Sequence, residues 1–302
     1  MHRAIAAVSV LVSLAGATHA AEPPATQTMK AVLVTGASSG IGRKITERLA
    51  AGGYFVYAGA RKDADLQALG SIRNVQALRL DVNKPQDIEA ARQAIERGGR
   101  GLHGLVNNAG VFTTGSVVAT TMEEFDTVMS TNVYGPWRMT RAFAPMIIAA
   151  KGRITNISSV SGIASFAETS AYSMSKFAVE AFTDALAQEM APLGVQVSAV
   201  EPGTYRSNII KNELQRSGTG AQYLDYAAHA KEPDEVAAAV EQALFEPKPK
   251  LRYLVVPDEK EARIAIEAQI QRLAELNERQ LYSYSRDDLI KMLDEALGRT
   301  SP

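Results

Sequence analysis

The sequence predicts one α/β domain: a doubly wound parallel sheet of about seven strands, with helices on both faces and a helical extension at the C-terminus. Two observations support this prediction. From residue 30 onward, short apolar runs that end in polar or glycine-rich turns alternate with amphipathic runs of helical spacing. The 302 residues, 46% of them hydrophobic, can also fill one large core. Such alternation is typical of parallel sheets, which bind ligands beyond the carboxyl ends of their strands.

The expected strands are short apolar segments, and a turn follows each of them. They cover residues 30–36, 55–60, 75–82, 104–110, 153–159, 195–203 and 252–256. Helices are expected between them, including Gly42–Ala51, which ends before two glycines, and Pro85–Arg97. Thr121 opens another helix, with Glu124 three residues later in the pattern of a capping box.

Composition divides the chain into three segments. Residues 1–28 have a short basic start, an apolar run and small residues near Ala20, which is typical of a secretory signal and too short to span a bilayer comfortably. We expect export or membrane association, with a cytoplasmic protein as the alternative. Residues 29–258 form the sheet domain. Residues 259–302 form a helical extension packed on that domain or on another subunit, since apolar residues recur there at helical spacing: Ile264, Ala268, Ile270, Leu273 and Leu276.

Charge and composition narrow the classes of partner. A net charge of −1 and a pI near 6.5 provide no field that would attract nucleic acid, so a small-molecule partner is expected. The absence of cysteine from the sequence excludes disulfides and thiolate ligands. The four histidines are scattered, which argues against a metal site.

The segment "LVTGASSGIGRK", residues 33–44, joins the first expected strand to the first helix. A helix N-terminus with free backbone N–H groups is a favourable place for a dinucleotide pyrophosphate. Gly36, Gly40 and Gly42 allow a phosphate to approach the backbone, although their G-x3-G-x-G spacing is looser than the G-x-G-x-x-G pattern. The turn therefore predicts a dinucleotide cofactor.

The end of the second expected strand indicates which dinucleotide is preferred. An acidic residue there would accept the ribose hydroxyls of NAD, whereas an arginine accommodates the 2′-phosphate of NADP. The strand ends in Ala60 and Arg61, and Arg43 supplies a second cation beside the glycine turn. NADP is therefore the expected cofactor, and NAD the less favoured one.

The segment "SAYSMSK" supplies the candidate for acid or base chemistry. Tyr172 and Lys176 are four residues apart and so lie one turn apart on the same face of a helix. An ammonium group beside a phenol favours the phenolate, which would lower the tyrosine pKa toward neutrality.

Seven short motifs together resemble one known family. "TGASSGIG", "LDV", "NNAG", "TNVYG", "ISSVSG", "YSMSK" and "VEPG" occur in the order and at the spacings of the classical short-chain dehydrogenase/reductases, over roughly residues 30 to 260. The resemblance implies a Rossmann-type domain and an NAD(P)-dependent oxidoreductase that interconverts a carbonyl and an alcohol. It also implies a homodimer or homotetramer.

The resemblance also implies site residues. Ser159 and Tyr172 would hold the carbonyl oxygen while Tyr172 donates the proton. Lys176 would lower the tyrosine pKa and hold the nicotinamide ribose, and Asn132 would bind a water that links Lys176 to solvent. The implied cofactor-binding residues, besides Tyr172 and Lys176, are Gly36, Ser38, Ser39, Gly40, Ile41, Gly42, Arg43, Arg61, Asp81, Val82, Asn108, Ala109, Gly110, Pro202, Gly203, Thr204 and Ser207; Asn107 belongs to the same turn as Asn108.

Two other functions stay open, and the substrate is not named by the sequence. A cofactor-binding sensor would lack one of the four catalytic residues. A sugar-nucleotide epimerase or dehydratase would carry a G-x2-G-x2-G turn and a larger C-terminal domain. The segment 204–231 is a candidate lid over the pocket. Its apolar residues favour a lipophilic carbonyl or alcohol: Ile209, Ile210, Leu214, Tyr223, Leu224 and Tyr226.

Overall fold

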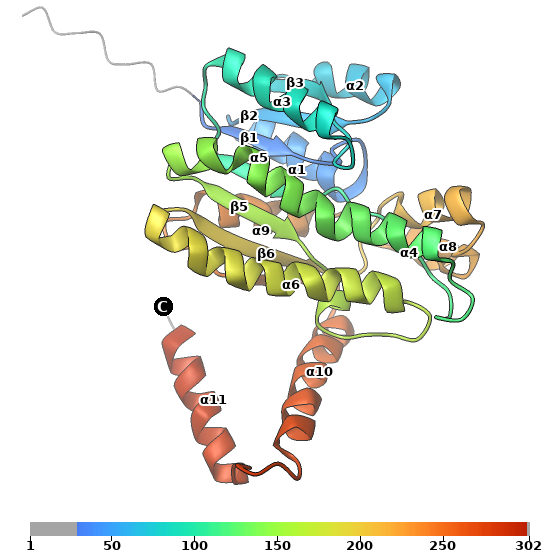
Figure 1. Ribbon diagram of the computed structural model, residues 1–302, viewed down its shortest axis with the longest axis vertical. Helices are drawn as coiled ribbons and strands as arrows, with labels where there is room; N and C mark the ends of the chain where they lie inside the picture. Colours follow the sequence, from blue (N-terminus) through green and yellow to red (C-terminus); the bar gives the residue numbers. More distant parts are fainter. Residues whose placement is uncertain (1–28, 301–302) are drawn as a thin grey trace, which may run out of the picture.

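The structure, a computed structural model, describes residues 29–300 (Figure 1). The signal-like segment predicted at residues 1–28 lies outside this range. No helix in the described range has the length and apolar character needed to cross a bilayer.

Seven parallel strands form a single sheet at the centre of the domain. The sheet has the order β3-β2-β1-β4-β5-β6-β7 and consists of β1 (Ala31–Val34), β2 (Phe55–Ala60), β3 (Val75–Arg79), β4 (Gly104–Asn107), β5 (Arg153–Ile157), β6 (Gln196–Pro202) and β7 (Arg252–Val255). The strand order reverses between β1 and β4, and ligands of such sheets bind outside the carboxyl ends of the strands at this switch point. The predicted doubly wound parallel sheet is confirmed.

Helices cover both faces of the sheet and form two separate apolar cores (Figure 1). On one face, α1 (Gly40–Ala51) and α9 (Asp234–Phe245) bury Ile45, Leu49, Val236 and Val240 against the strands. Three helices cover the other face: α3 (Pro85–Gly98), α5 (Gly135–Ala149) and α6 (Ser170–Met190). They bury Ile95, Met139, Phe143 and Leu186 against the strands. The short α2 (Asp63–Gly70) contributes Leu69 to the first core.

The helix that leads into α5 is interrupted by one π-helical turn. α4 (Met122–Met129) begins at Thr121, whose side chain and that of Glu124 form the predicted capping box. Residues Ser130–Tyr134 then widen into a π turn before α5 begins. Turns of this kind often occur at functional sites, and Asn132 lies in this one.

Two segments extend beyond the sheet. After β6, α7 (Ile209–Ser217) and α8 (Leu224–His229) lie together (Figure 1). At the C-terminus, α10 (Glu259–Asn277) and α11 (Arg286–Thr300) form a V below the domain (Figure 1). The first turns of α10 contact the domain, where Ala265 is buried and Gln269 Nε2 donates to Ile163 O at 3.3 Å. Beyond them the apolar side chains are exposed, as are those of α11: Ile266, Ile270, Leu273, Leu276, Ile290, Leu293 and Leu297.

Candidate active site

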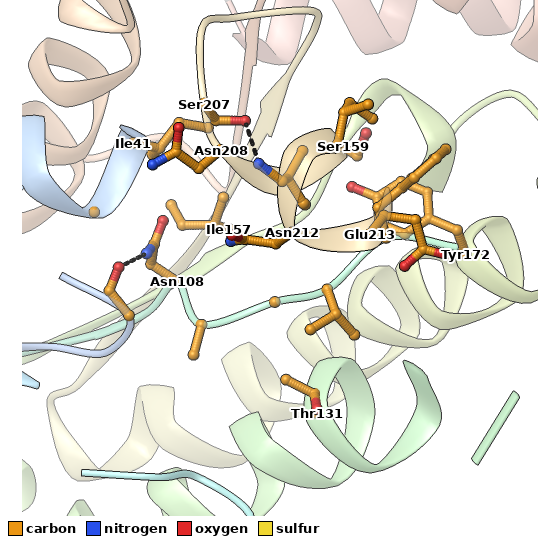
Figure 2. A pocket seen from close by; sticks show the side chains of 18 of the residues that line it. Ile41, Asn108, Thr131, Ile157, Ser159, Tyr172, Ser207, Asn208, Asn212 and Glu213 are labelled. Atoms are coloured by element: carbon orange, nitrogen blue, oxygen red, sulfur yellow. Dashed lines mark hydrogen bonds between the residues drawn. The ribbon is translucent and has the colours of Figure 1, made fainter. Parts of the chain in front are cut away.

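A cavity of about 820 Å³ opens at the carboxyl ends of the strands. Its walls come from the glycine turn, from the loops after β2, β4, β5 and β6, and from α7. Figure 2 shows Ser159, Tyr172 and Glu213 toward one end of this cavity and Ile41 and Asn108 toward the other. The volume lies in the range that holds small molecules.

The glycine turn packs so tightly that side chains are excluded from it. Gly36 has a φ of +65°, and a Cβ built there would lie 2.9 Å from Ala109 Cα. A Cβ on Gly42 would lie 2.3 Å from Gly36 O. The N-cap residue Ser39 makes no side-chain capping bond to the first turn of α1. The turn therefore leaves the positive end of α1 available, as a bound pyrophosphate requires.

Thr35 and Asn108 fasten the glycine turn to the loop after β4. Thr35 Oγ1 accepts from the backbone N–H groups of Asn108 and Ala109, both at 2.9 Å. Asn108 Nδ2 donates to Thr35 O at 2.9 Å and to Gly36 O at 3.2 Å. The neighbouring Asn107 points elsewhere and donates to Asn156 Oδ1 inside the sheet at 2.8 Å. Sequence analysis missed Thr35, because a threonine at a strand end carries no distinctive signal.

Three candidate catalytic side chains meet on the cavity wall. Ser159 follows β5 and hydrogen-bonds through its side chain to Tyr172. Lys176 lies one turn beyond Tyr172 on α6, with its Nζ 5.6 Å from the centre of the tyrosine ring. The lysine Nζ also donates to Ile157 O at 3.0 Å, which holds it at the end of β5.

Asn132 lies behind this group and does not line the cavity. Its Oδ1 accepts from Val111 N at 2.8 Å, and its Nδ2 donates to Val111 O at 2.9 Å and to Ser175 Oγ at 3.0 Å. The Ser175 hydroxyl in turn donates to Tyr172 O at 2.6 Å. The Asn132 side chain thus ties the loop after β4 to the turn of α6 that carries Tyr172. The water-binding role implied for it stays a prediction.

Burial dominates the electrostatics of the pair on α6. It raises the pKa of Tyr172 to about 12, and the hydrogen bond from Ser159 opposes this rise. Burial also lowers the pKa of Lys176 to about 8, against the opposing effect of Glu180. The spacing of Tyr172 and Lys176 predicted a lowered tyrosine pKa, and this prediction was wrong: the pKa is raised, because burial is the largest influence on it. Tyr172 therefore keeps its proton at neutral pH, which suits a proton donor.

The end of the cavity near β2 holds two cationic residues. Arg61 and Lys62 line it, together with Asp81 and Val82. The other predicted cation, Arg43, is not part of the cavity wall, and its Nε donates to Glu47 Oε1 at 2.6 Å. Lys62 was missed, although its position directly after Arg61 was visible in the sequence.

The loop after β6 is supported by the C-terminal helix. Pro202, Gly203, Thr204 and Ser207 all line the cavity, and their binding of a cofactor stays a prediction. The backbone N–H of Thr204 donates to Glu261 Oε2 on α10 at 2.9 Å. Sequence analysis assigned no role to Glu261, because the contact joins residues 57 positions apart.

A buried carboxylate on α7, within the candidate lid segment, holds this helix at the other end of the cavity. Glu213 on α7 accepts hydrogen bonds from the hydroxyls of Thr113 and Ser217 at 2.8 Å each, and it pairs with Arg216. Arg216 also donates to Phe112 O at 2.6 Å. The sequence carried no signal for this network, which depends on how α7 packs against the loop after β4.

Aromatic rings line the cavity beside the lid. The Phe112 ring packs edge-on against Tyr172, with centres 5.0 Å apart, and against Tyr223, with centres 5.9 Å apart. Phe166 and Ile210 line the same cavity. This end therefore offers an aromatic surface next to the Tyr172 ring.

The fold and the site together define a class of protein: a Rossmann-type domain with a serine after β5 and a tyrosine and a lysine one turn apart on α6. The chain belongs to the short chain dehydrogenase family, whose sequence profile matches residues 30–218. The resemblance noted in the sequence is thereby confirmed. Residues 29–300 contain no cluster of three or more histidine, aspartate or glutamate side chains that could hold a metal ion.

Among curated proteins, the chain is similar to two dehydrogenases. It is 42% identical over 189 residues to the mitochondrial D-beta-hydroxybutyrate dehydrogenase of Bos taurus, covering 58% of this chain and 54% of that protein. It is 40% identical over 192 residues to retinol dehydrogenase 5 of Mus musculus, covering 62% and 60%. The chain thus spans little more than half the length of these relatives.

Solved structures share the whole domain. A short-chain dehydrogenase from Streptomyces avermitilis superposes with a TM-score of 0.72 and 32% identity, covering 84% of this chain and 96% of that one. A serine dehydrogenase complexed with NADP+ has a TM-score of 0.68 at 28% identity, with coverages of 74% and 94%. A 3-ketoacyl-(acyl-carrier-protein) reductase from Brucella melitensis complexed with NADH has a TM-score of 0.68 at 26% identity, with coverages of 77% and 98%.

Proposed function

We propose that this protein is an oxidoreductase that interconverts a carbonyl and an alcohol with NADP(H), and that Tyr172 is its acid or base. One observation carries the proposal: a single cavity joins the glycine turn of α1 to the Ser159 and Tyr172 hydroxyls and to Lys176. The glycine turn fits a dinucleotide because Ser39 makes no side-chain cap to α1, which leaves the backbone N–H groups of its first turn available for a phosphate. Two bound relatives, one with NADP+ and one with NADH, support a dinucleotide of either kind.

Residues of this chain supply the proton that carbonyl reduction needs. When bound, the nicotinamide supplies or takes up the hydride. A carbonyl oxygen that accepts hydrogen bonds from Ser159 and Tyr172 is placed to receive the tyrosine proton. Since burial keeps Tyr172 protonated at neutral pH, the site is prepared for carbonyl reduction. Alcohol oxidation needs the phenolate, and a charged Lys176 stabilises that form.

Two cations favour NADP over NAD. Arg61 and Lys62 line the cavity beyond the end of β2, where a 2′-phosphate would extend from the adenosine ribose. Asp81 and Val82 line the same end and are the proposed contacts of the adenine. Arg43 stays a candidate for the phosphate, in competition with its ion pair to Glu47.

The substrate is proposed to be lipophilic. The cavity wall beside Tyr172 includes three aromatic residues, Phe112, Phe166 and Tyr223, and the Phe112 ring contacts the rings of Tyr172 and Tyr223. Apolar surface of this kind favours an apolar carbonyl or alcohol over a hydroxylated one, because each polar group of a substrate would lose its hydration there. The similarity to retinol dehydrogenase 5, whose name denotes an apolar alcohol, supports this class.

Assembly and location are also proposals. Trp137 on α5 is 59% exposed and contacts Phe182 on α6, leaving an apolar surface for a second subunit in a dimer or tetramer. Export or membrane association is proposed from residues 1–28, with a cytoplasmic protein as the alternative.

A substrate panel tests the activity. Purified protein is assayed with NADPH and with NADH against apolar and hydroxylated ketones and aldehydes of similar size, and with the matching alcohols and oxidised cofactors, by nicotinamide absorbance. We expect the highest kcat/KM for an apolar carbonyl with NADPH. A preference for hydroxylated or charged carbonyls would contradict the proposed substrate class, and no turnover with any member would contradict the activity.

A further inference from the structure

Two acidic residues continue the face of α6 that carries the candidate catalytic pair. Tyr172, Lys176, Glu180 and Asp184 follow one another at intervals of four, so each lies one turn beyond the last and is rotated from it by about 40° around the helix. Lys176 and Glu180 are buried, with 7% and 9% of their surface exposed. The Asp184 side chain, by contrast, is 48% exposed. Glu180 is thus a buried carboxyl group one turn beyond the lysine.

A second buried carboxyl group meets Glu180 from the sheet. Glu201 is 3% exposed and directly precedes the Pro202–Gly203 turn of the site. The Oε1 atoms of Glu180 and Glu201 are buried and have no hydrogen-bond partner in the described part of the chain, and both carboxyl groups lie at the Nε atom of Arg252, 3.1 and 3.4 Å away. Two ionised carboxylates buried beside one guanidinium repel each other, so the pair is expected to hold one proton between them.

The guanidinium of Arg252 forms ion pairs with three carboxyl groups. Arg252 Nε on β7 lies 3.1 Å from Glu180 Oε2 and 3.4 Å from Glu201 Oε1, and Arg252 Nη2 lies 2.6 Å from Asp184 Oδ1. Burial, followed by the charge of Glu180, raises the pKa of Glu201 well above its usual range. The pair therefore keeps one proton at neutral pH.

The pair can exchange this proton with solvent. Glu180 and Glu201 line a second cavity of about 500 Å³, between α6 and α10. Arg272 lines its wall on α10, with the guanidinium 4.9 Å from the centre of the Phe177 ring. The charged groups around the pair are thus Lys176 and Asp184 on its own side, Arg252 on β7 and Arg272 on α10.

We propose that Glu180 is a positioning residue that keeps Lys176 charged, and that Glu201 adjusts this effect through the proton it shares with Glu180. While the pair holds its proton, it presents one negative charge to the lysine. When the proton leaves to solvent through the second cavity, the pair presents two. The inference rests on the proposed function, because it is the charged lysine that stabilises the Tyr172 phenolate.

The expected effect is on the pH profile of alcohol oxidation. Oxidation needs Tyr172 ionised and Lys176 charged, so log kcat/KM rises with pH and levels off where the lysine loses its proton. Burial alone lowers the pKa of Lys176, and Glu180 raises it again. Removing the Glu180 charge should move the levelling point to lower pH, and each unit of that shift lowers the plateau about tenfold.

Three variants separate the roles. Glu180→Gln should lower the plateau by about tenfold and leave the rising part of the profile in place. Glu201→Gln should lower kcat/KM for alcohol oxidation more at alkaline pH than near neutrality. The reason is that glutamine cannot ionise, so the pair cannot present a second negative charge to Lys176. Asp184→Asn is the control, since Asp184 contacts the same Arg252 but is about half exposed and lies two turns from Lys176, and its profile should stay close to that of the wild type. Superimposable profiles for Glu180→Gln and wild type would overturn the proposal, as would an equal loss for Glu201→Gln at every pH.

A readout without turnover keeps the inference separate from the proposed function. Potentiometric titration of wild type and Glu201→Gln, from about pH 6 to about pH 10, should show one more proton released by the wild type in the upper half of this range. Thermal unfolding checks that each variant is folded. Equal proton release would overturn the shared proton, whereas a protein that titrates as expected but reduces no substrate would contradict only the proposed function.

Discussion

The Lys176 ammonium lies 5.6 Å from the centre of the Tyr172 ring, one turn along α6. Tyr172 nevertheless has a pKa raised to about 12 and Lys176 a pKa lowered to about 8, because both are desolvated. Proton donation by Tyr172 is therefore available throughout the neutral range, while proton acceptance depends on pH. This asymmetry sets the first prediction.

Reduction and oxidation should respond differently to pH. Since Tyr172 is protonated below its raised pKa, kcat/KM for carbonyl reduction should change little between about pH 6 and about pH 8. For alcohol oxidation, which needs the phenolate, it should rise close to tenfold per pH unit up to about pH 8, where Lys176 begins to lose its charge. Initial rates measured against pH in both reaction directions check this prediction. An oxidation rate that does not change with pH over the same range would contradict the assignment of Tyr172 as the base.

The cofactor preference should depend on Arg61. NADPH is expected to bind at least about tenfold more tightly than NADH, which corresponds to about 1.4 kcal/mol. Arg61→Asp should narrow or reverse this difference, because a carboxylate repels the 2′-phosphate and accepts ribose hydroxyls. Fluorescence titration of each cofactor measures it. Arg43→Gln tests the other arginine separately; equal dissociation constants for NADPH and NADH in the wild type would contradict the preference.

The lid should loosen when Glu213 loses its charge. Glu213→Gln leaves Arg216 without its buried partner and puts an amide donor among hydroxyl donors. We expect KM for the carbonyl substrate to rise about tenfold, with cofactor binding unchanged, since a hydrogen-bonded charge typically contributes about 1.5–3 kcal/mol. Glu232→Gln is the matched control, because its ion pair with Arg206 is exposed. A larger effect of the control than of Glu213→Gln would rule out this role for the network.

Assembly should be visible in solution. The exposed Trp137 side chain on α5 lies against Phe182 of α6, and this surface is the proposed subunit contact. Multi-angle light scattering at micromolar concentration should report a dimer or a tetramer. Trp137→Glu should shift the population toward monomer, since burial of an unpaired charge is costly. A wild-type protein that is entirely monomeric at this concentration would contradict the prediction of a dimer or tetramer.

Much of the architecture could be predicted from the sequence because strand and helix patterns are local. The apolar segments of residues 31–34 and 153–157, for example, became β1 and β5, and Thr121 and Glu124 formed the capping box that their spacing predicts. The glycine turn and the pair on α6 were also recognisable, since each lies within a dozen consecutive residues.

What the sequence did not reveal are contacts between distant segments. Glu261 supports Thr204 from the C-terminal helix, and Glu213 holds Thr113 across 100 positions. The direction of the pKa shift at Tyr172 was also predicted wrongly: a lowered pKa was expected, and the pKa is raised. Helical spacing brings the lysine close, but the extent of desolvation depends on how β5, α6 and the lid pack together.

The most direct test of the central claim follows the hydride and the proton together. NADPH deuterated at the transferred position of its nicotinamide is incubated with an apolar carbonyl and with either wild type or Tyr172→Phe, and the product is analysed by mass spectrometry. The account predicts deuterium on the product carbinol carbon with the wild type, and a rate at least about a hundredfold lower with Tyr172→Phe, whose cofactor dissociation constant should be unchanged. Deuterium incorporation at the same rate with Tyr172→Phe, or none with the wild type on any carbonyl of the panel, would contradict it.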